Sequence, residues 1–138
     1  MKVAITGSTG MIGTRLTRSL RAEGHAVTRI VRSYSGLPHG ERGIVWHPEQ
    51  GVIEAGRLEA HDLVIHLAAE SLAGVWTPAK KRRIRESRAQ GTTLLAKTLA
   101  SLDAPPRVLF SASAVGIYGD RPDEPVLDEN STVGTGFL

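Results

Sequence analysis

The chain has 138 residues, a formal net charge of +3, a sequence pI near 9.7 and 41% hydrophobic residues. This length suits one domain with a packed core better than two domains. The absence of cysteine excludes a disulfide scaffold and a thiolate metal site, and it favours a reducing, cytoplasmic location. The apolar run at the start is too short for a signal peptide, and no later run has membrane-spanning length, so no membrane partner is expected.

Short β-branched runs alternate with helical patterns along the chain, which predicts βαβ units and a parallel sheet. After a first strand at 2–6, Ile12, Leu16 and Leu20 recur every four residues on a helix that stops near Gly24. Thr77 is the expected N-cap of a second helix, which runs to about residue 102. Further strands are expected at 26–31, 43–47, 62–69 and 107–114.

These elements together predict an α/β fold, a Rossmann-type doubly wound parallel sheet that is incomplete after its fifth strand. Residues 1–138 are expected to form a single dinucleotide-binding domain. The segment that follows residue 114 has no periodicity and has nothing within the chain to pack against. We therefore expect the chain to be a fragment that lacks a C-terminal substrate region.

The stretch "TGSTGMIG" places three glycines at three-residue spacing, directly after a strand and directly before a helix. Gly7 permits a tight turn, Gly10 lets the backbone approach a pyrophosphate, and Gly13 lets helix and strand come together. Free amides at the helix N-terminus then face the phosphates. The alternative is a glycine-rich turn that binds nothing. The cofactor-binding residues expected in this loop are Gly7, Ser8, Thr9, Gly10, Met11, Ile12 and Gly13.

The end of the second strand indicates which dinucleotide fits. A carboxylate at this position would bind the ribose hydroxyls of NAD, and an acid there is also more typical of flavin sites. This chain has Arg32 and Ser33 instead, and a guanidinium beside a hydroxyl suits a 2′-phosphate. NADP is therefore expected as cofactor in preference to NAD. The alternative is that Arg32 is an ordinary charged residue at a strand end.

Four stretches, "TGSTGMIG", "DLVIHLAAE", the "SR…GT…LA" helix and "SASAVGIYGD", resemble the extended and atypical short-chain dehydrogenases/reductases. More narrowly they resemble the nucleoside-diphosphate-sugar epimerase-like branch, from the first residue to the last. The resemblance implies an NADP-dependent oxidoreductase that transfers hydride on a carbonyl or carbinol carbon of a small molecule such as a nucleotide sugar. It also implies that Leu67, Ala68 and Ala69 line the ribose and nicotinamide side of the cofactor, at the carboxyl end of a central strand.

The second helix carries an arginine and a glycine on the stripe that faces the sheet, formed by Ile84, Arg88, Gly91, Leu95, Leu99 and Leu102. Arg88 is expected to reach the cofactor phosphates or the active site, with snorkelling from a half-buried face as the alternative. Gly91 costs stability inside a helix unless another group approaches it closely. His66 is expected to be a core or strand-end histidine, and no metal site is expected because no second metal-type ligand is spaced near it. The run "KKRRIR" wraps around the helix without a nucleic-acid motif, so nucleic acid is not an expected partner, whereas a second copy of the chain is.

Ser113 matches the serine that, in the resembling family, hydrogen-bonds the reacting oxygen of the substrate; an ordinary strand-end hydroxyl is the alternative. The usual proton donor of that family is a tyrosine with a lysine four residues later, and neither Tyr34 nor Tyr118 has one. The pair is expected near or beyond Phe137 and Leu138. Either the chain stops before the pair or this branch lacks it, so the fragment is expected to be inactive. A protein that binds NADP without turnover, as a sensor or scaffold, is the rival hypothesis.

Overall fold

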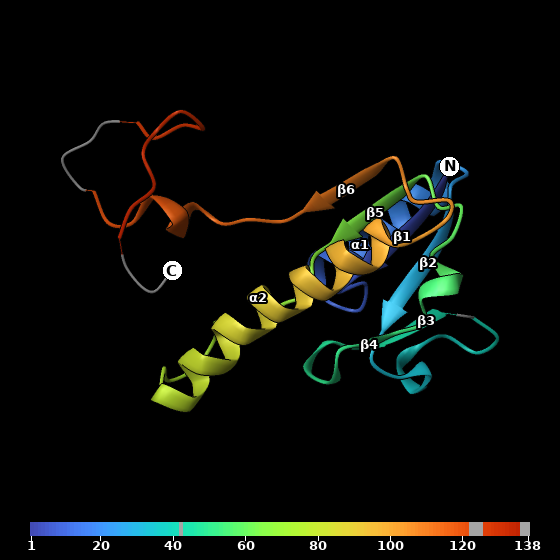
Figure 1. Ribbon diagram of the computed structural model, residues 1–138, viewed down its shortest axis with the longest axis horizontal. Helices are drawn as coiled ribbons and strands as arrows, with labels where there is room; N and C mark the ends of the chain where they lie inside the picture. Colours follow the sequence, from blue (N-terminus) through green and yellow to red (C-terminus); the bar gives the residue numbers. More distant parts are fainter. Residues whose placement is uncertain (42, 122–125, 136–138) are drawn as a thin grey trace.

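The computed structural model describes residues 1–41, 43–121 and 126–135. Within these residues the strands form one sheet, with the order β4-β3-β2-β1-β5-β6 (Figure 1). Their bounds are β1 Lys2–Thr6, β2 Ala26–Val31, β3 Gly43–His47, β4 Val52–Ile53, β5 Leu63–His66 and β6 Val108–Ser111. The helices are α1 Met11–Ala22 and α2 Pro78–Ala100, with short 3₁₀ turns at Tyr34–Gly36, Pro48–Gln50, Ala55–Arg57 and Val115–Tyr118.

The sheet is parallel except at one edge. β1 lies between β2 and β5, and β3 and β6 extend the parallel pairing outward. β4 pairs antiparallel with β3, with Trp46 opposite Ile53, and it was not predicted because two residues are too short for a pattern. The strand order reverses between β1 and β5, which is where open α/β sheets bind ligands. The predicted Rossmann-type α/β fold is confirmed.

The two helices cover opposite faces of the sheet (Figure 1). Alternate residues of β1 point to opposite faces, as the period of a strand requires. On one face Val3, Ile5 and Ile65 pack with Leu16 and Leu20 of α1. On the other face, Leu95 and Leu99 of α2 pack in a larger cluster whose strand residues are Ala4, Ile30, Ile44, Trp46 and Val64. Both faces of the central strands are therefore apolar, which explains their unbroken hydrophobic runs.

The predicted bounds hold where the local pattern is strong. The strands at 2–6, 26–31 and 43–47 are confirmed, and the Thr77 hydroxyl caps α2 by accepting a hydrogen bond from the amide of Lys80 at 3.2 Å. The strand predicted at 62–69 is wrong at its far end, because β5 ends at His66. The next two amides, those of Leu67 and Ala68, donate to the Thr6 side chain. The strand predicted at 107–114 likewise shortens to Val108–Ser111.

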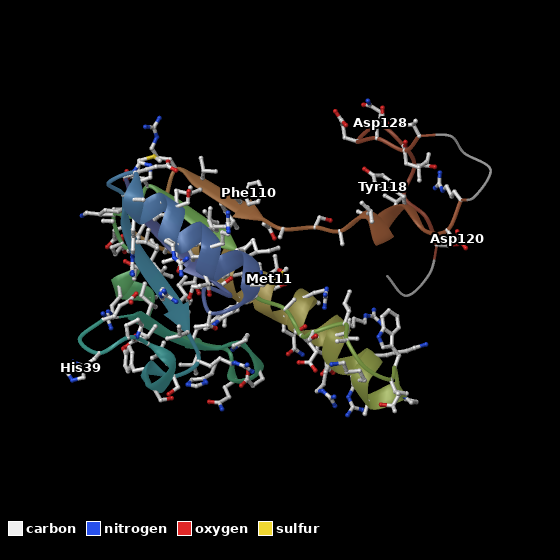
Figure 2. All side chains as sticks on the ribbon, turned by 180° about the vertical axis from the view of Figure 1, so that it is seen from behind. Met11, His39, Phe110, Tyr118, Asp120 and Asp128 are labelled. Carbon is white, nitrogen blue, oxygen red and sulfur yellow. The ribbon has the colours of Figure 1, made fainter. Side chains whose placement is uncertain are left out.

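Beyond β6 the segment that contains the last 3₁₀ turn extends away from the sheet (Figure 1). Seen from behind, Tyr118 and Asp128 lie well apart from Met11 at the start of α1 (Figure 2). Among the helices of the described residues, none combines the length and the apolar character needed to cross a membrane.

Candidate functional site

An open cleft of about 690 Å³ lies at the carboxyl ends of β1, β2 and β5, at the point where the strand order reverses. Open α/β sheets bind their ligands at this position. Eight residues predicted from the sequence line this cleft: Gly7, Thr9, Gly10, Arg32, Ser33, Leu67, Ala68 and Ala69. Three separate stretches of the sequence therefore meet at one site.

The turn after β1 is shaped by glycines that have no room for a side chain. Gly7 has φ +65°, a conformation that favours glycine, and a Cβ atom there would lie 2.8 Å from the carbonyl carbon of Leu67. A Cβ atom at Gly13 would lie 2.2 Å from the carbonyl oxygen of Gly7, so α1 packs directly on the turn. Gly10 is the N-cap of α1 and offers no side-chain cap, which leaves amides of the first turn available to an anion.

Four residues predicted in this loop lie outside the cleft lining. Gly13 packs under the turn, and Ser8 is almost fully buried, with no hydrogen-bond partner for its hydroxyl within the described residues. Met11 and Ile12 are the first two residues of α1 and are 88% and 63% exposed. Figure 2 shows Met11 at this first turn of the helix. The backbone of this loop, rather than these side chains, shapes the cleft.

Two arginines, Arg29 within β2 and Arg32 directly after it, have different roles. Arg29 forms an ion pair with Glu41 at 3.0 Å and donates to the carbonyl of Ser8 at 3.1 Å, so it braces the glycine-rich turn from the α1 side. A hydrogen bond from Arg21, with the charge of Arg29 nearby, lowers the pKa of Glu41. Arg32 is exposed, lines the cleft and forms no ion pair with any residue of the described ranges. The Ser33 hydroxyl beside it accepts from the amide of Ser35 at 3.2 Å.

The end of β5 is held by side chains from β1 and α2. The buried Thr6 hydroxyl lies 3.1 Å from the amides of both Leu67 and Ala68 and 2.7 Å from Nδ1 of His66. Nε2 of His66 lies 3.1 Å from the hydroxyl of Thr92. Burial lowers the pKa of the His66 imidazole below its ordinary value. The prediction that His66 is a core or strand-end residue is confirmed, since it is the last residue of β5 and only 4% of it is exposed.

Arg88 has partners other than those the sequence predicted. Its guanidinium donates to the carbonyl oxygens of Glu70 at 3.3 Å and Ile84 at 3.1 Å, and it does not line the cleft. The Glu70 amide donates to the Ser87 hydroxyl at 2.9 Å, and its carboxylate accepts from Nζ of Lys80 at 2.9 Å. The hydrogen bond from Lys80, with Arg83 nearby, lowers the pKa of Glu70. The "SR" pair of α2 therefore fixes the backbone of Glu70.

Sequence reasoning missed the far wall of the cleft. Glu70 follows Ala69, while the other residues come from β3, from the turn after it and from α2: Trp46, Pro48, Glu49, Arg83, Glu86, Ser87 and Gln90. The described lining residues therefore include three carboxylates and two guanidinium groups. Gly91 was a usable signal for this wall, because the ring of Trp46 packs against it, 3.6 Å from a Cβ atom built at that position. Binding of an anionic ligand in this cleft therefore depends on the individual guanidinium groups that it contacts and not on the net charge of the lining.

The serine predicted for catalysis is not among the residues that line the cleft. Ser113 is exposed and lies outside the lining. The Tyr34 hydroxyl donates to the Glu54 carboxylate at 3.1 Å and accepts from Arg57 at 2.9 Å. The expected position of a tyrosine and lysine pair, near Phe137 and Leu138, lies outside the described residues. Within the described part of the chain, no three histidine or carboxylate side chains gather as a metal site.

Comparison with known proteins adds a family to this geometry. A model of the NAD-dependent epimerase/dehydratase family matches residues 3–136. An epimerase family protein of Mycobacterium bovis is 42% identical over 137 residues, which cover 99% of this chain and 44% of that protein. The chain spans less than half the length of the curated relatives it matches.

Solved structures match the same fold. A nucleoside-diphosphate sugar epimerase from Corynebacterium glutamicum has a TM-score of 0.78 and 38% identity over 99% of this chain and 27% of that chain. A human epimerase family protein with NADPH has a TM-score of 0.69 and 30% identity over 86% of this chain and 38% of that one. A short-chain dehydrogenase/reductase superfamily protein from Agrobacterium tumefaciens with bound NAD has a TM-score of 0.76 and 26% identity, over 99% and 40%.

Proposed function

Because the chain belongs to the NAD-dependent epimerase/dehydratase family, we propose that its cleft binds a nicotinamide adenine dinucleotide and prefers NADP to NAD. The glycine-rich turn fits such a ligand, since side chains at Gly7 and Gly13 would collide with neighbouring backbone and the first turn of α1 has no side-chain cap. These features let a pyrophosphate approach the amides closely.

The observation that carries the preference for NADP is the position of Arg32. It lines the same cleft as the glycine-rich turn, it has no ion-pair partner in the described ranges, and a hydroxyl follows it at Ser33. Arg29 forms an ion pair with Glu41, so of these two arginines Arg32 is the one whose guanidinium is available to bind a phosphate. Relatives support either coenzyme, because the human structure contains NADPH and that from Agrobacterium tumefaciens contains NAD.

For the whole protein we propose oxidoreductase or epimerase chemistry on a carbonyl or carbinol carbon of a small molecule, with a nucleotide sugar as one substrate class. The similarity to the nucleoside-diphosphate sugar epimerase of Corynebacterium glutamicum supports that class. A nicotinamide coenzyme, when bound, supplies or accepts the hydride. In this chain Ser113 is the residue proposed to hydrogen-bond the reacting oxygen, and a serine alone does not deliver a proton at neutral pH.

Titration calorimetry of the chain with NADP and NAD tests the cofactor proposal. Wild type should bind NADP more tightly, and Arg32→Ala should weaken NADP by about tenfold or more, the value of a hydrogen bond to a charged group, with a much smaller effect on NAD. Arg18→Ala, an exposed change on α1 outside the cleft lining, should leave both affinities unchanged. Equal affinities of wild type for the two coenzymes, or equal losses in Arg32→Ala, would contradict the assignment of Arg32.

A further inference from the structure

The Thr6 hydroxyl is buried at the carboxyl end of β1 and has three hydrogen-bond partners in the described residues. Two of them are the amides of Leu67 and Ala68, which lie sixty-one and sixty-two positions along the chain. The third is Nδ1 of His66, at 2.7 Å. Amides only donate, so the Thr6 oxygen accepts two hydrogen bonds from them.

A count of donors and acceptors determines the tautomer of His66. A hydroxyl has two lone pairs and one hydrogen, and the two amides use both lone pairs of Thr6. The Thr6 hydrogen is therefore donated to Nδ1 of His66, which must be unprotonated. The imidazole then carries its proton on Nε2, from which it donates to the Thr92 hydroxyl at 3.1 Å.

We propose that His66 is a positioning residue for the cleft: through Thr6, it holds the peptide groups of Leu67 and Ala68 against the glycine-rich turn. The proposal rests on the proposed binding of a dinucleotide in this cleft. Leu67 and Ala68 line the cleft, and Gly7 packs so closely on their peptide group that a Cβ atom would lie 2.9 Å from the Ala68 nitrogen. A shift of this peptide group would therefore also displace the glycine-rich turn, so two parts of the cleft lining would move together.

The surroundings of His66 suit a fixed, neutral ring. The side chains that hydrogen-bond or stack on it are Thr6 of β1, Thr92 of α2 and Trp46 of β3, whose ring meets it edge to face at a centroid distance of 5.8 Å. None of these three carries a charge. If the ring gained a proton on Nδ1, Thr6 would have to accept from it and release one of the two amides.

Two substitutions separate the ring nitrogens. Asparagine places an acceptor oxygen the same number of bonds from the backbone as Nδ1, whereas glutamine places its amide at the position of Nε2. We expect His66→Asn to keep the bond from Thr6 and to bind NADPH within about threefold of wild type. His66→Gln should keep only the Thr92 side and bind about tenfold more weakly, the value of one hydrogen bond of about 1.4 kcal/mol. Thr92→Val, the matched control, removes the outer bond and should change affinity by less than about threefold.

The experiment measures NADPH fluorescence titrations for these variants together with hydrogen exchange of the Leu67 and Ala68 amides. The exchange should be faster in His66→Gln than in His66→Asn even without coenzyme, so the positioning role is tested even if the chain fails to bind NADPH. Equal affinity and equal exchange in the two variants would overturn the proposal. If wild type failed to bind NADPH while the exchange difference was present, the proposed function and the role of His66 in the cleft would be overturned. The hydrogen bonding of His66 through Thr6 to the amides of Leu67 and Ala68 would still stand.

A measurement on the unaltered chain covers the case in which a variant fails to fold. Nitrogen-15 spectra of the histidine rings should show His66 with an unprotonated Nδ1 and a proton on Nε2 at neutral pH. The opposite tautomer would overturn the proposal. Thr6→Ser, which keeps the hydroxyl, should protect the two amides, and Thr6→Val should expose them to exchange.

Discussion

Arg88 shows how a charged residue on an inward-facing helix stripe is accommodated. Its guanidinium satisfies the carbonyl of Glu70, while Ser87 satisfies the amide of the same residue and Lys80 holds its carboxylate. The polar groups of Glu70 are thereby anchored to α2. A segment without regular structure is given a fixed position at the mouth of the cleft, because a helix supplies the hydrogen bonds that a strand partner would otherwise provide.

Replacing Arg88 by methionine tests this anchor. Methionine keeps an apolar stem of similar reach but leaves two carbonyl oxygens without the guanidinium, so the free energy of unfolding should fall by about 1–2 kcal/mol. The free energy of unfolding of Arg88→Lys should lie between those of wild type and Arg88→Met, because an ammonium group lacks the planar fork of a guanidinium. Urea unfolding of the three chains is the measurement, and equal midpoints would show that the contacts to Glu70 add nothing to stability.

The histidine at the end of β5 predicts a dependence of stability on pH. Burial lowers the pKa of His66 in the folded chain, whereas the unfolded chain has the ordinary value of about 6.5. Between these two values the unfolded chain binds more protons, so the free energy of unfolding falls as the pH drops from about 6.5 toward the folded pKa. Below the folded pKa this loss is complete.

Urea unfolding of wild type and His66→Asn between about pH 7.5 and about pH 5.5 checks this window. Wild type should lose stability as the pH falls, and the variant, which has no imidazole at this position, should lose less. Glu41 and Glu70, whose pKa values are lowered from 4.5, contribute stability that is lost only at more acidic pH, so they do not confuse the comparison. Parallel curves for the two chains would contradict the assignment to His66.

At the scale of elements, α2 packs on the sheet through Leu95 and Leu99 and on β3 through Trp46. The Trp46 ring packs against Gly91, so a small residue suits this position. The space there is nevertheless large enough for a side chain of one carbon atom. A Cβ atom would lie 3.6 Å from the ring, an ordinary contact distance. This differs from Gly13, where α1 packs so closely on the glycine-rich turn that no side chain fits.

Gly91→Ala should therefore stabilise the chain. Alanine is favoured over glycine inside a helix by about 0.5–1 kcal/mol, and here its methyl group also fills a contact with Trp46. Thermal or urea unfolding should show a higher midpoint, with an unchanged dependence on denaturant. Gly13→Ala is the opposing control, since it should lower stability sharply. A destabilised Gly91→Ala would mean that the helix sits closer to Trp46 than the structure places it.

At the scale of the whole molecule, the sheet is covered unevenly. The central strands are buried on both faces, whereas β6 is open, with Val108 54% and Phe110 59% exposed. Phe110, labelled on this strand in Figure 2, pairs with Ile65, which packs with α1, so it lies on the same face of the sheet as α1 and still remains exposed. Parallel strands are normally buried on both faces, so β6 gains its order from pairing with β5 more than from packing.

Two substitutions should report this difference. Leu95→Ala removes a fully buried side chain from the α2 face and should lower the free energy of unfolding by about 2–5 kcal/mol. Phe110→Ser changes an exposed side chain and should cost less than about 1 kcal/mol. Urea unfolding of the 138-residue chain compares them. A large loss in Phe110→Ser would show that β6 is covered in solution, and sedimentation would then reveal whether a second copy covers it.

Local patterns in the sequence were sufficient for the order of the helices and of every described strand except β4, for the cap at Thr77 and for the glycine-rich turn. Each of these depends on residues close together in the chain, such as the glycine spacing or the apolar period of a strand. The fold class followed because alternating strands and helices have few stable arrangements. The comparisons, which match nearly the whole chain, confirmed the family that the sequence motifs resemble.

The tertiary structure decided how individual side chains are used. Arg29 and Arg32 are three residues apart, yet only the position of Glu41 shows that Arg29 is already paired. The strand predicted at 62–69 ends early because Thr6, from another strand, takes the next amides. Hydrogen bonds and ion pairs between residues so far apart in the chain leave no periodic trace in the sequence, since they depend on how the sheet brings distant strand ends together.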